Sequence, residues 1–335
     1  MSQEILEVLD PGLLTTIQDG GRFGYEADGV PQSGAADLIG LAIANVLLGN
    51  EPDAAGLELT LLGPRLRALV DVDLALGGAD LAAAIERGAP GGGQRTTRER
   101  APTGSTIRLR AGDVLAVGGR PDEPGAGCRA YLAAPGGVEV PLVLDSRSTC
   151  LPAGFGGLDG RALRAGDRIA AQGAGGRPER RLATRRLAEI PSPAQRIRVL
   201  PGPASGDGDP AFAGLIERVW LVAPESDRRG LRLEPAADPD GLARLAPLAA
   251  GELPSHGVLP GSVQVTPSGQ PLVLMPDAGT TGGYPVVAVV ISADLPILGQ
   301  LAPGAEVRFR ATDADAARDA ELERRRFLAA LADLP

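Results

Sequence analysis

The chain has 335 residues, which is enough for two ordinary domains or for one large domain with a substantial core. Its net charge of −9 argues against nucleic acid as a partner, and two cysteines with a single histidine argue against a structural zinc site. The sequence contains no lysine, so this chain can form no Schiff base, has no phosphate-loop lysine and offers no lysine for covalent biotin.

The composition favours a mainly β protein with a few helices. The 47 glycines and 30 prolines indicate many short elements that are joined by tight turns. At the N-terminal end we expect short strands at residues 4–9 and 13–18, each followed by a glycine-containing turn. A helix should come next, with Ser33 as its N-cap and Gly49 just beyond its C-terminal end.

A segment rich in arginine, glycine and proline, residues 172–195, is the best candidate for a linker between domains. It predicts an N-terminal domain at residues 1–190, which contains one helix. It also predicts a C-terminal domain at residues 196–335, which ends in a helix. Two separate cores are therefore expected.

The C-terminal domain is expected to be an array of short strands, including strands at residues 262–266, 271–275 and 286–292. Its final helix should be capped near Thr312 or Asp313, because acidic residues follow in the first turns. The apolar residues of this helix recur on one face, which predicts that the face packs against a core.

The first ten residues, MSQEILEVLD, contain acids where a secretion signal would have a basic segment followed by an apolar one. No uninterrupted apolar run reaches the length that a membrane-spanning helix needs. We therefore expect a cytoplasmic protein.

The segment LMPDAGTTGGYP, residues 274–285, combines a carboxylate, two threonine hydroxyls and flexible glycines between two apolar runs. One interpretation is a long hairpin connection, in which glycine supplies positive φ and proline marks the start of the next strand. The alternative is a substrate loop whose hydroxyls and backbone amides face a polar ligand. The segment by itself favours the hairpin connection, since such loops are common in β proteins.

Several blocks along the chain are similar to one known family. They include GLLTTIQDGGRFGY, DSRSTCLPAGFGGLDGRALRAGD and SHGVLPGSVQVTPSGQPLVLMPDAGTTGGYP, in this order and over nearly the whole chain. With them the sequence resembles the C subunits of the bacterial 5-oxoprolinase family. Relatives of that family are the second subunit of allophanate hydrolase and the carboxyltransferase region of urea amidolyase. The resemblance implies two β-barrel domains of the cyclophilin-like kind.

The resemblance also implies one component of an enzyme rather than a complete enzyme. It implies a hydrolase acting on a cyclic amide, which opens 5-oxoproline to glutamate at the expense of ATP together with a homologous B subunit and a separate A subunit. The nucleotide would be held on this chain by arginines and backbone, or on a partner. One alternative is a carboxyltransferase that uses biotin carried on another chain and acts on urea or a similar amide. A second is a regulatory binding protein that antagonises an inhibitor of a histidine kinase.

The site residues implied by the resemblance lie mainly in the last block. The expected catalytic residues are Asp277, Gln264 and Arg228, and the expected substrate-binding residues are Thr280, Thr281, Gly282, Gly283 and Tyr284. Arg228 could clamp a carboxylate or phosphate through two parallel hydrogen bonds. No metal ligands are expected. The segment SDRRGLRL departs from the family pattern at Asp227 and Leu231, which leaves the choice of substrate open.

Three further features favour structural interpretations. His256, the only histidine, lies between Ser255 and Gly257 and is expected to be a turn residue rather than a general base. The run QDGGR at residues 18–22 predicts a glycine turn, although its Arg22 could serve to reach a neighbouring domain or subunit. Residues 91–98, GGGQRTTR, predict a hairpin tip and not a phosphate-binding loop.

Overall fold

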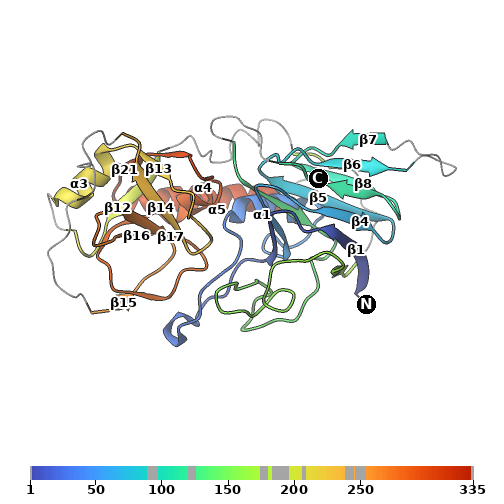
Figure 1. Ribbon diagram of the computed structural model, residues 1–335, viewed down its shortest axis with the longest axis horizontal. Coiled ribbons are helices and arrows are strands. Elements are labelled where there is room, and N and C mark those ends of the chain that lie inside the picture. Colours follow the sequence, from blue (N-terminus) through green and yellow to red (C-terminus); the bar gives the residue numbers. More distant parts are fainter. Residues whose placement is uncertain are drawn as a thin grey trace. The chain divides into compact units, whose positions relative to one another are not determined.

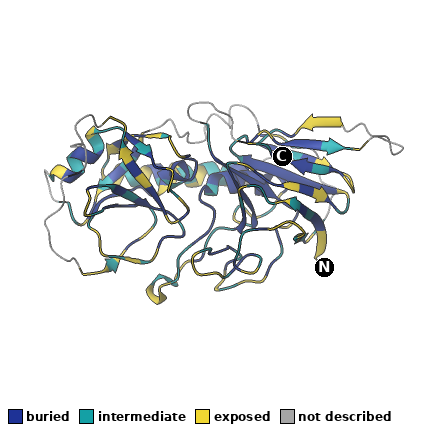
Figure 2. Cartoon of the chain, in the orientation of Figure 1, coloured by how far each residue is buried: buried dark blue, intermediate teal, exposed yellow. Residues whose placement is uncertain are grey.

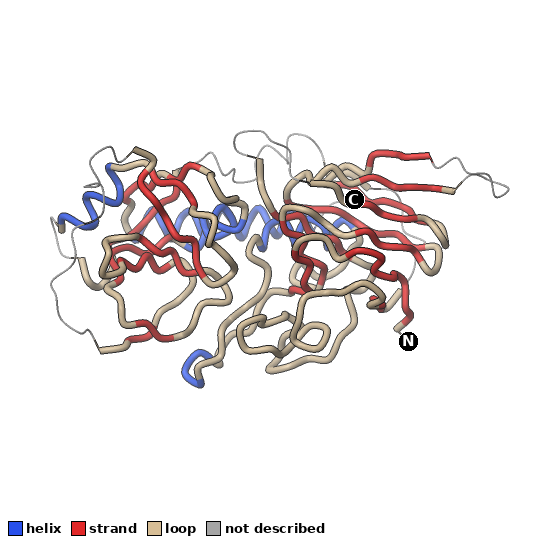
Figure 3. Tube along the Cα trace, in the orientation of Figure 1, coloured by secondary structure: helices blue, strands red, loops and turns tan. Residues whose placement is uncertain are grey.

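The structure is a computed structural model, and it describes residues 2–88, 97–119, 126–173, 180–182, 196–205, 209–237, 245 and 254–332. The expectation of a mainly β fold is confirmed (Figure 3). The chain divides into two compact units. Unit 1 comprises Met1–Arg22, Ser33–Ile190 and Phe327–Pro335, and unit 2 comprises Phe23–Gln32 and Pro191–Arg326.

These units differ from the expected domains in two places. The segment Phe23–Gln32, expected in the first domain, belongs to unit 2, and the end of the C-terminal helix from Phe327 belongs to unit 1. The linker expected at residues 172–195 lies mostly outside the described residues, and so do residues 91–96 of the expected hairpin tip.

Unit 1 contains two antiparallel sheets (Figure 1). The six-stranded sheet has, in order, β11 (Arg168–Ala171), β1 (Gln3–Asp10), β4 (Arg65–Ala68), β9 (Val114–Ala116), β6 (Ala84–Arg87) and β7 (Thr97–Arg100). The five-stranded sheet has, in order, β2 (Leu14–Gln18), β3 (Gly56–Thr60), β10 (Arg129–Ala133), β5 (Val72–Gly78) and β8 (Ser105–Leu109). One apolar core draws on both sheets, with members such as Leu6 and Leu66 from the first and Leu57 and Leu74 from the second. Figure 2 shows β5 as buried, whereas the edge strand β7 is exposed.

Helix α1 (Leu38–Leu47) packs against the five-stranded sheet through a second apolar cluster, which contains Leu41 of the helix together with Ala75 and Tyr131 of the strands. Gly77 permits this close approach, because a Cβ there would lie 2.1 Å from the carbonyl oxygen of Gly40. Phe327, Leu328 and Leu331 join the same cluster, so the apolar face expected for the C-terminal helix is confirmed.

The sequence pattern predicts Ser33 as the N-cap of α1, but the N-cap in the structure is Asp37. One carboxylate oxygen of Asp37 accepts hydrogen bonds from the backbone N–H groups of Ile39, at 3.0 Å, and Gly40, at 2.9 Å. Ser33 has φ 53° and lies outside the helix. Both residues are capping types, and the choice between them depends on where the chain leaves the preceding loop.

Replacing Asp37 with alanine should therefore lower the free energy of unfolding of this chain by about 1–2 kcal/mol, the usual cost of removing an N-cap. Chemical unfolding of the variant measures this loss. Glu51→Ala, at an exposed position soon after the helix, is the matched control and should change little. Equal stability of the two variants would contradict the capping role.

Arg22 of the QDGGR turn is fully buried within its own unit. Its Nε donates to the carbonyl of Val143 at 2.9 Å, its Nη2 donates to the carbonyl of Ser148 at 3.0 Å, and its guanidinium lies 4.7 Å from the ring centroid of Phe155. The structural role favoured for this turn is confirmed. These three partners all lie in unit 1, and the suggestion that Arg22 also reaches another domain or subunit stays a prediction.

Unit 2 is built on one eight-stranded sheet (Figure 1). Its order is β20 (Glu306–Val307), β13 (Trp220–Val222), β14 (Gly230–Pro235), β17 (Pro271–Leu274), β16 (Ser262–Val265), β19 (Val286–Val290), β12 (Ile197–Pro201) and β21 (Phe309–Ala311). The two outermost strands, β20 and β21, are separated in sequence only by Arg308, so the chain itself nearly closes the sheet into a barrel. Side chains alternate as a barrel wall requires: Leu231 and Leu233 of β14 are buried, and Arg232 between them is exposed.

The remaining elements of unit 2 are short, apart from the last helix. The helices are α3 (Pro210–Glu217), α4 (Leu295–Gly299) and α5 (Ala314–Ala332), with 3-10 turns at Glu26–Asp28 and Ser292–Asp294. Asp313 accepts a hydrogen bond from the backbone of Ala316 at 2.8 Å, as the predicted cap requires. A two-stranded pair, β15 (His256–Gly257) with β18 (Thr281–Gly282), lies apart from the large sheet (Figure 3). Within the described residues, no helix is both long enough and apolar enough to cross a membrane.

Candidate ligand-binding pocket

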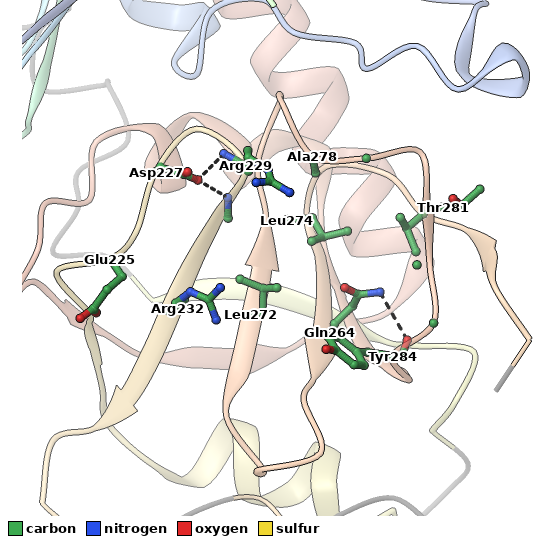
Figure 4. A pocket seen from close by; sticks show the side chains of 15 residues that line it. Glu225, Asp227, Arg229, Arg232, Gln264, Leu272, Leu274, Ala278, Thr281 and Tyr284 are labelled. Atoms are coloured by element: carbon green, nitrogen blue, oxygen red, sulfur yellow. Dashed lines mark hydrogen bonds between the residues drawn. The ribbon is translucent and has the colours of Figure 1, made fainter. Parts of the chain in front are cut away.

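A cavity of about 330 Å³ lies on the outer face of the barrel in unit 2 (Figure 4). Its floor comes from three neighbouring strands, β14, β17 and β16. Their register places Arg232 opposite Leu272, and Leu272 opposite Gln264. Because neighbouring residues across a sheet share one face, these three side chains line the same side of the barrel wall.

The lining changes in character from one end of the pocket to the other. Charged side chains belong to the turn before β14 and to β14 itself, apolar side chains occupy the middle, and polar groups belong to the loop after β17. The lining residues, in chain order, are Glu225, Asp227, Arg229, Gly230, Arg232, Val258, Gln264, Leu272, Leu274, Ala278, Gly279, Thr281, Gly282, Gly283 and Tyr284. The lining is thus mixed, with more polar than apolar surface, and the volume lies near the lower end of the range usual for small-molecule sites.

The charged end is formed by a tight turn that Asp227 stabilises. A carboxylate oxygen of Asp227 accepts hydrogen bonds from the backbone N–H of Arg229 at 2.7 Å and of Gly230 at 3.2 Å. Gly230 lets the turn lie close to β17, since a Cβ there would lie 2.6 Å from a methyl carbon of Leu272 and would require that side chain to move. The turn therefore fixes the backbone from which Arg229 extends over the pocket (Figure 4).

At the other end of the pocket, Gln264 holds its amide against the 278–284 loop. The residue is 4% exposed, and its Nε2 lies 3.4 Å from the carbonyl oxygen of Tyr284, to which it donates (Figure 4). A Cβ added at Gly282 would lie 2.3 Å from the same nitrogen. Glycine at position 282 is thus what leaves room for the Gln264 amide beside the loop.

Replacing Gly282 with alanine should displace the Gln264 amide and weaken ligand binding in this pocket by about tenfold, while the barrel stays folded. Gly257→Ala is the matched control, because a Cβ at Gly257 meets no atom within 4 Å and this residue does not line the pocket. Titration calorimetry of the two variants with 5-oxoproline, the substrate that the family resemblance implies, measures the difference. Equal affinities would show that Gly282 does not position Gln264.

Asp277 and Arg228 form a buried ion pair and are not among the residues that line the pocket. Arg228 donates from Nε to Asp277 at 2.8 Å and from Nη2 to the other carboxylate oxygen at 3.1 Å. Asp277 is 1% exposed and Arg228 is 3% exposed. The backbone N–H of Asp277 also donates to the carbonyl of Arg228 at 2.9 Å. The pair thus joins the turn before β14 to the loop after β17, the two segments that carry the pocket's ends.

The structure brings most of the expected site residues together. Gln264, Thr281, Gly282, Gly283 and Tyr284 line one pocket, whereas Asp277 and Arg228, which were expected to share it, are buried in their own ion pair. Thr280 is half-buried beside them, and its carbonyl accepts a hydrogen bond from Val258 at 2.9 Å. His256 pairs with Gly282 in the small β15–β18 ladder and is not among the lining residues.

Sequence reasoning missed Arg229 as a member of the pocket. It singled out the neighbouring Arg228, which the structure buries. Arg232 could have been found from its place in the alternation of Leu231, Arg232 and Leu233, because an arginine between two core leucines faces outward.

A small-molecule pocket on the wall of a β-barrel unit is the class of site that the geometry defines, and comparison with known proteins shows the family. Residues 28–311 match the carboxyltransferase domain, subdomain A and B, and the chain belongs to this family. It is 36% identical over 329 residues to the C subunit of 5-oxoprolinase from Escherichia coli (strain K12), and the match covers 98% of each chain.

Two solved structures are similar over nearly all of this chain. The crystal structure of TTHA0988 has 36% sequence identity and a TM-score of 0.75, and the match covers 92% of this chain and 55% of that one. The K. lactis urea amidolyase has 28% identity and a TM-score of 0.80, and the match covers 100% of this chain and 20% of that one. The matched region is therefore about half of the first protein and a fifth of the second.

Proposed function

We propose that this chain is one component of an ATP-dependent 5-oxoprolinase in the cytoplasm, and that it acts with separate A and B subunits. The reaction would convert 5-oxoproline, ATP and water into glutamate, ADP and phosphate. The observation that supports this most strongly is the match to the C subunit of a 5-oxoprolinase over 98% of both chains. The outer-face pocket of unit 2 is the proposed substrate site, because it combines a charged end, an apolar floor and a polar end.

The pocket's polar end suits an amide. A lactam presents one N–H donor and one carbonyl acceptor, and the Gln264 amide supplies one group of each kind. Thr281 and Tyr284 add hydroxyl groups at the same end of the pocket. Ring opening requires activation of a poor electrophile, and phosphorylation of the amide oxygen by ATP would create a leaving group. In this proposal the chain binds and orients the lactam.

ATP itself does not fit the described residues of this pocket. A triphosphate with its Mg²⁺ calls for several cations, a phosphate-binding backbone cradle and carboxylate ligands for the metal. The pocket is about 330 Å³, and its lining offers two cations, Arg229 and Arg232, and no lysine. We therefore assign the nucleotide to a partner.

The need for partners is supported by the size of the similar proteins. The matched region is 55% of the TTHA0988 chain and 20% of the urea amidolyase, so in both proteins this fold is one part of a larger chain. We infer that the present chain obtains the remaining functions from separate subunits.

A second candidate is a carboxyltransferase that receives a carboxyl group from biotin on another chain and passes it to urea or a similar amide. It is favoured by the likeness to urea amidolyase over the full chain. Product analysis separates the two candidates. The chain, co-purified with A and B subunits, should form glutamate and ADP from 5-oxoproline and ATP. Carboxylation of urea with a carboxylated biotin carrier, and no glutamate, would support the carboxyltransferase instead.

A further inference from the structure

Two arginines of the pocket differ from many other arginines of this chain in lacking a carboxylate partner. Arg228 is paired with Asp277 and Arg198 with Asp294, to give two examples from the same unit. Arg229 and Arg232 line the charged end of the pocket, and within the described residues no carboxylate lies within ion-pair distance of either guanidinium. Each therefore has its hydrogen-bond donors available to a ligand.

We propose that Arg229 and Arg232 form an anion subsite, so that the pocket selects a small carboxylated amide over a neutral one. The inference rests on the proposed function and names the feature of the substrate that this end of the pocket would recognise. A guanidinium can hold a carboxylate through two parallel N–H···O bonds, and a second guanidinium beside it strengthens the preference for negative charge.

Within the described residues, neither of the two acids that also line this end forms an ion pair with Arg229 or Arg232. The Asp227 carboxylate is already engaged by the backbone N–H groups of Arg229 and Gly230. Glu225 lies on the far side of Arg232, with its carboxylate directed away from Leu272 (Figure 4). Arg232 instead turns its guanidinium toward Leu272, over the middle of the pocket (Figure 4).

The order of groups along the pocket fits one arrangement of an acid lactam. The register across the three strands runs from Arg232 through Leu272 to Gln264. A carboxylate on the arginines would leave the ring methylenes over the leucine and the amide near Gln264. A neutral amide such as urea offers the arginine end a carbonyl oxygen but no carboxylate, so it lacks the charge-assisted hydrogen bonds that an acid would form there.

The test compares 5-oxoproline with 2-pyrrolidinone, the same lactam ring without the carboxylate, in calorimetric titrations of the full chain. The acid should bind at least about tenfold more tightly. Arg229→Met and Arg232→Met should each weaken binding of the acid by roughly 10- to 100-fold and leave 2-pyrrolidinone unchanged. Arg310→Gln, at an exposed position on β21 outside the pocket, is the control and should change neither. Thermal unfolding confirms that each variant is folded.

Equal binding of the acid and the neutral lactam would overturn the subsite, as would failure of the wild-type chain to bind the acid. A parallel turnover assay with A and B subunits distinguishes failure of the anion subsite from failure of the proposed function. Glutamate formation with an unchanged KM in both arginine variants would remove the subsite and leave the function standing. Selective binding of the acid without any glutamate formation would support the subsite and overturn the proposed function.

Discussion

Replacing Asp277 with alanine should lower the free energy of unfolding of this chain by about 3–5 kcal/mol, the usual cost of breaking a buried ion pair from one side. The change leaves the guanidinium of Arg228 buried without the carboxylate that accepts two of its hydrogen bonds. The sequence alone predicts a different outcome, a loss of the assembled enzyme's activity by orders of magnitude with little loss of fold, because a loop acid is not part of the core packing. The 1% exposure of Asp277 removes that reason.

A double variant separates the pair's contribution to folding from its contribution to activity. Replacing both partners, as Arg228→Met with Asp277→Leu, should recover most of the lost stability, because apolar residues of similar volume often replace a buried pair without cost. Urea unfolding of the wild type, both single variants and the double variant completes the cycle. If Asp277→Ala loses less than about 1 kcal/mol, the pair does not hold the two loops together.

Replacing Gln264 with alanine should lower kcat/KM of the assembled enzyme by about 100- to 1000-fold. This is the effect commonly seen when an enzyme loses one side chain that hydrogen-bonds the reacting group of its substrate. Gln264 is buried, but its main partner in the structure is a single carbonyl at 3.4 Å, so the fold should lose little. The purified subunits would be assayed for glutamate release over a range of 5-oxoproline concentrations.

Gln270→Ala provides the matched control for this measurement. Gln270 follows the turn of the same β16–β17 hairpin and is not among the residues that line the pocket. It should leave kcat/KM unchanged. A well-folded Gln264→Ala enzyme with normal kcat/KM would place the substrate elsewhere.

Much of the fold could be predicted because it depends on local patterns. The alternation of Val263, Gln264 and Val265 predicts a strand with its valines in the barrel core, and the structure places these valines at 0% and 2% exposure. The cap and the apolar face of α5 were equally predictable. The choice of Asp37 over Ser33 was not, because both residues are suitable caps and their backbone conformations decide.

The parts of the site that could not be predicted depend on contacts between distant residues. Arg228 and Arg229 are adjacent and chemically identical, yet Arg228 is buried against Asp277, which lies 49 residues further along the chain, and Arg229 lines the pocket. The assignment of Phe23–Gln32 to unit 2 is equally non-local, since nothing in its composition separates it from the first domain. The family resemblance identified the loop after β17 but not the arginine end of the pocket.

The central claim is that this chain is a necessary but insufficient part of a 5-oxoprolinase, and omission of single subunits tests it most directly. The initial rate of glutamate formation from 5-oxoproline and ATP would be measured for this chain alone, for the A and B subunits without it, and for all three together. We predict turnover only in the complete mixture. Robust glutamate formation by this chain alone, or by the A and B subunits without it, would contradict the account.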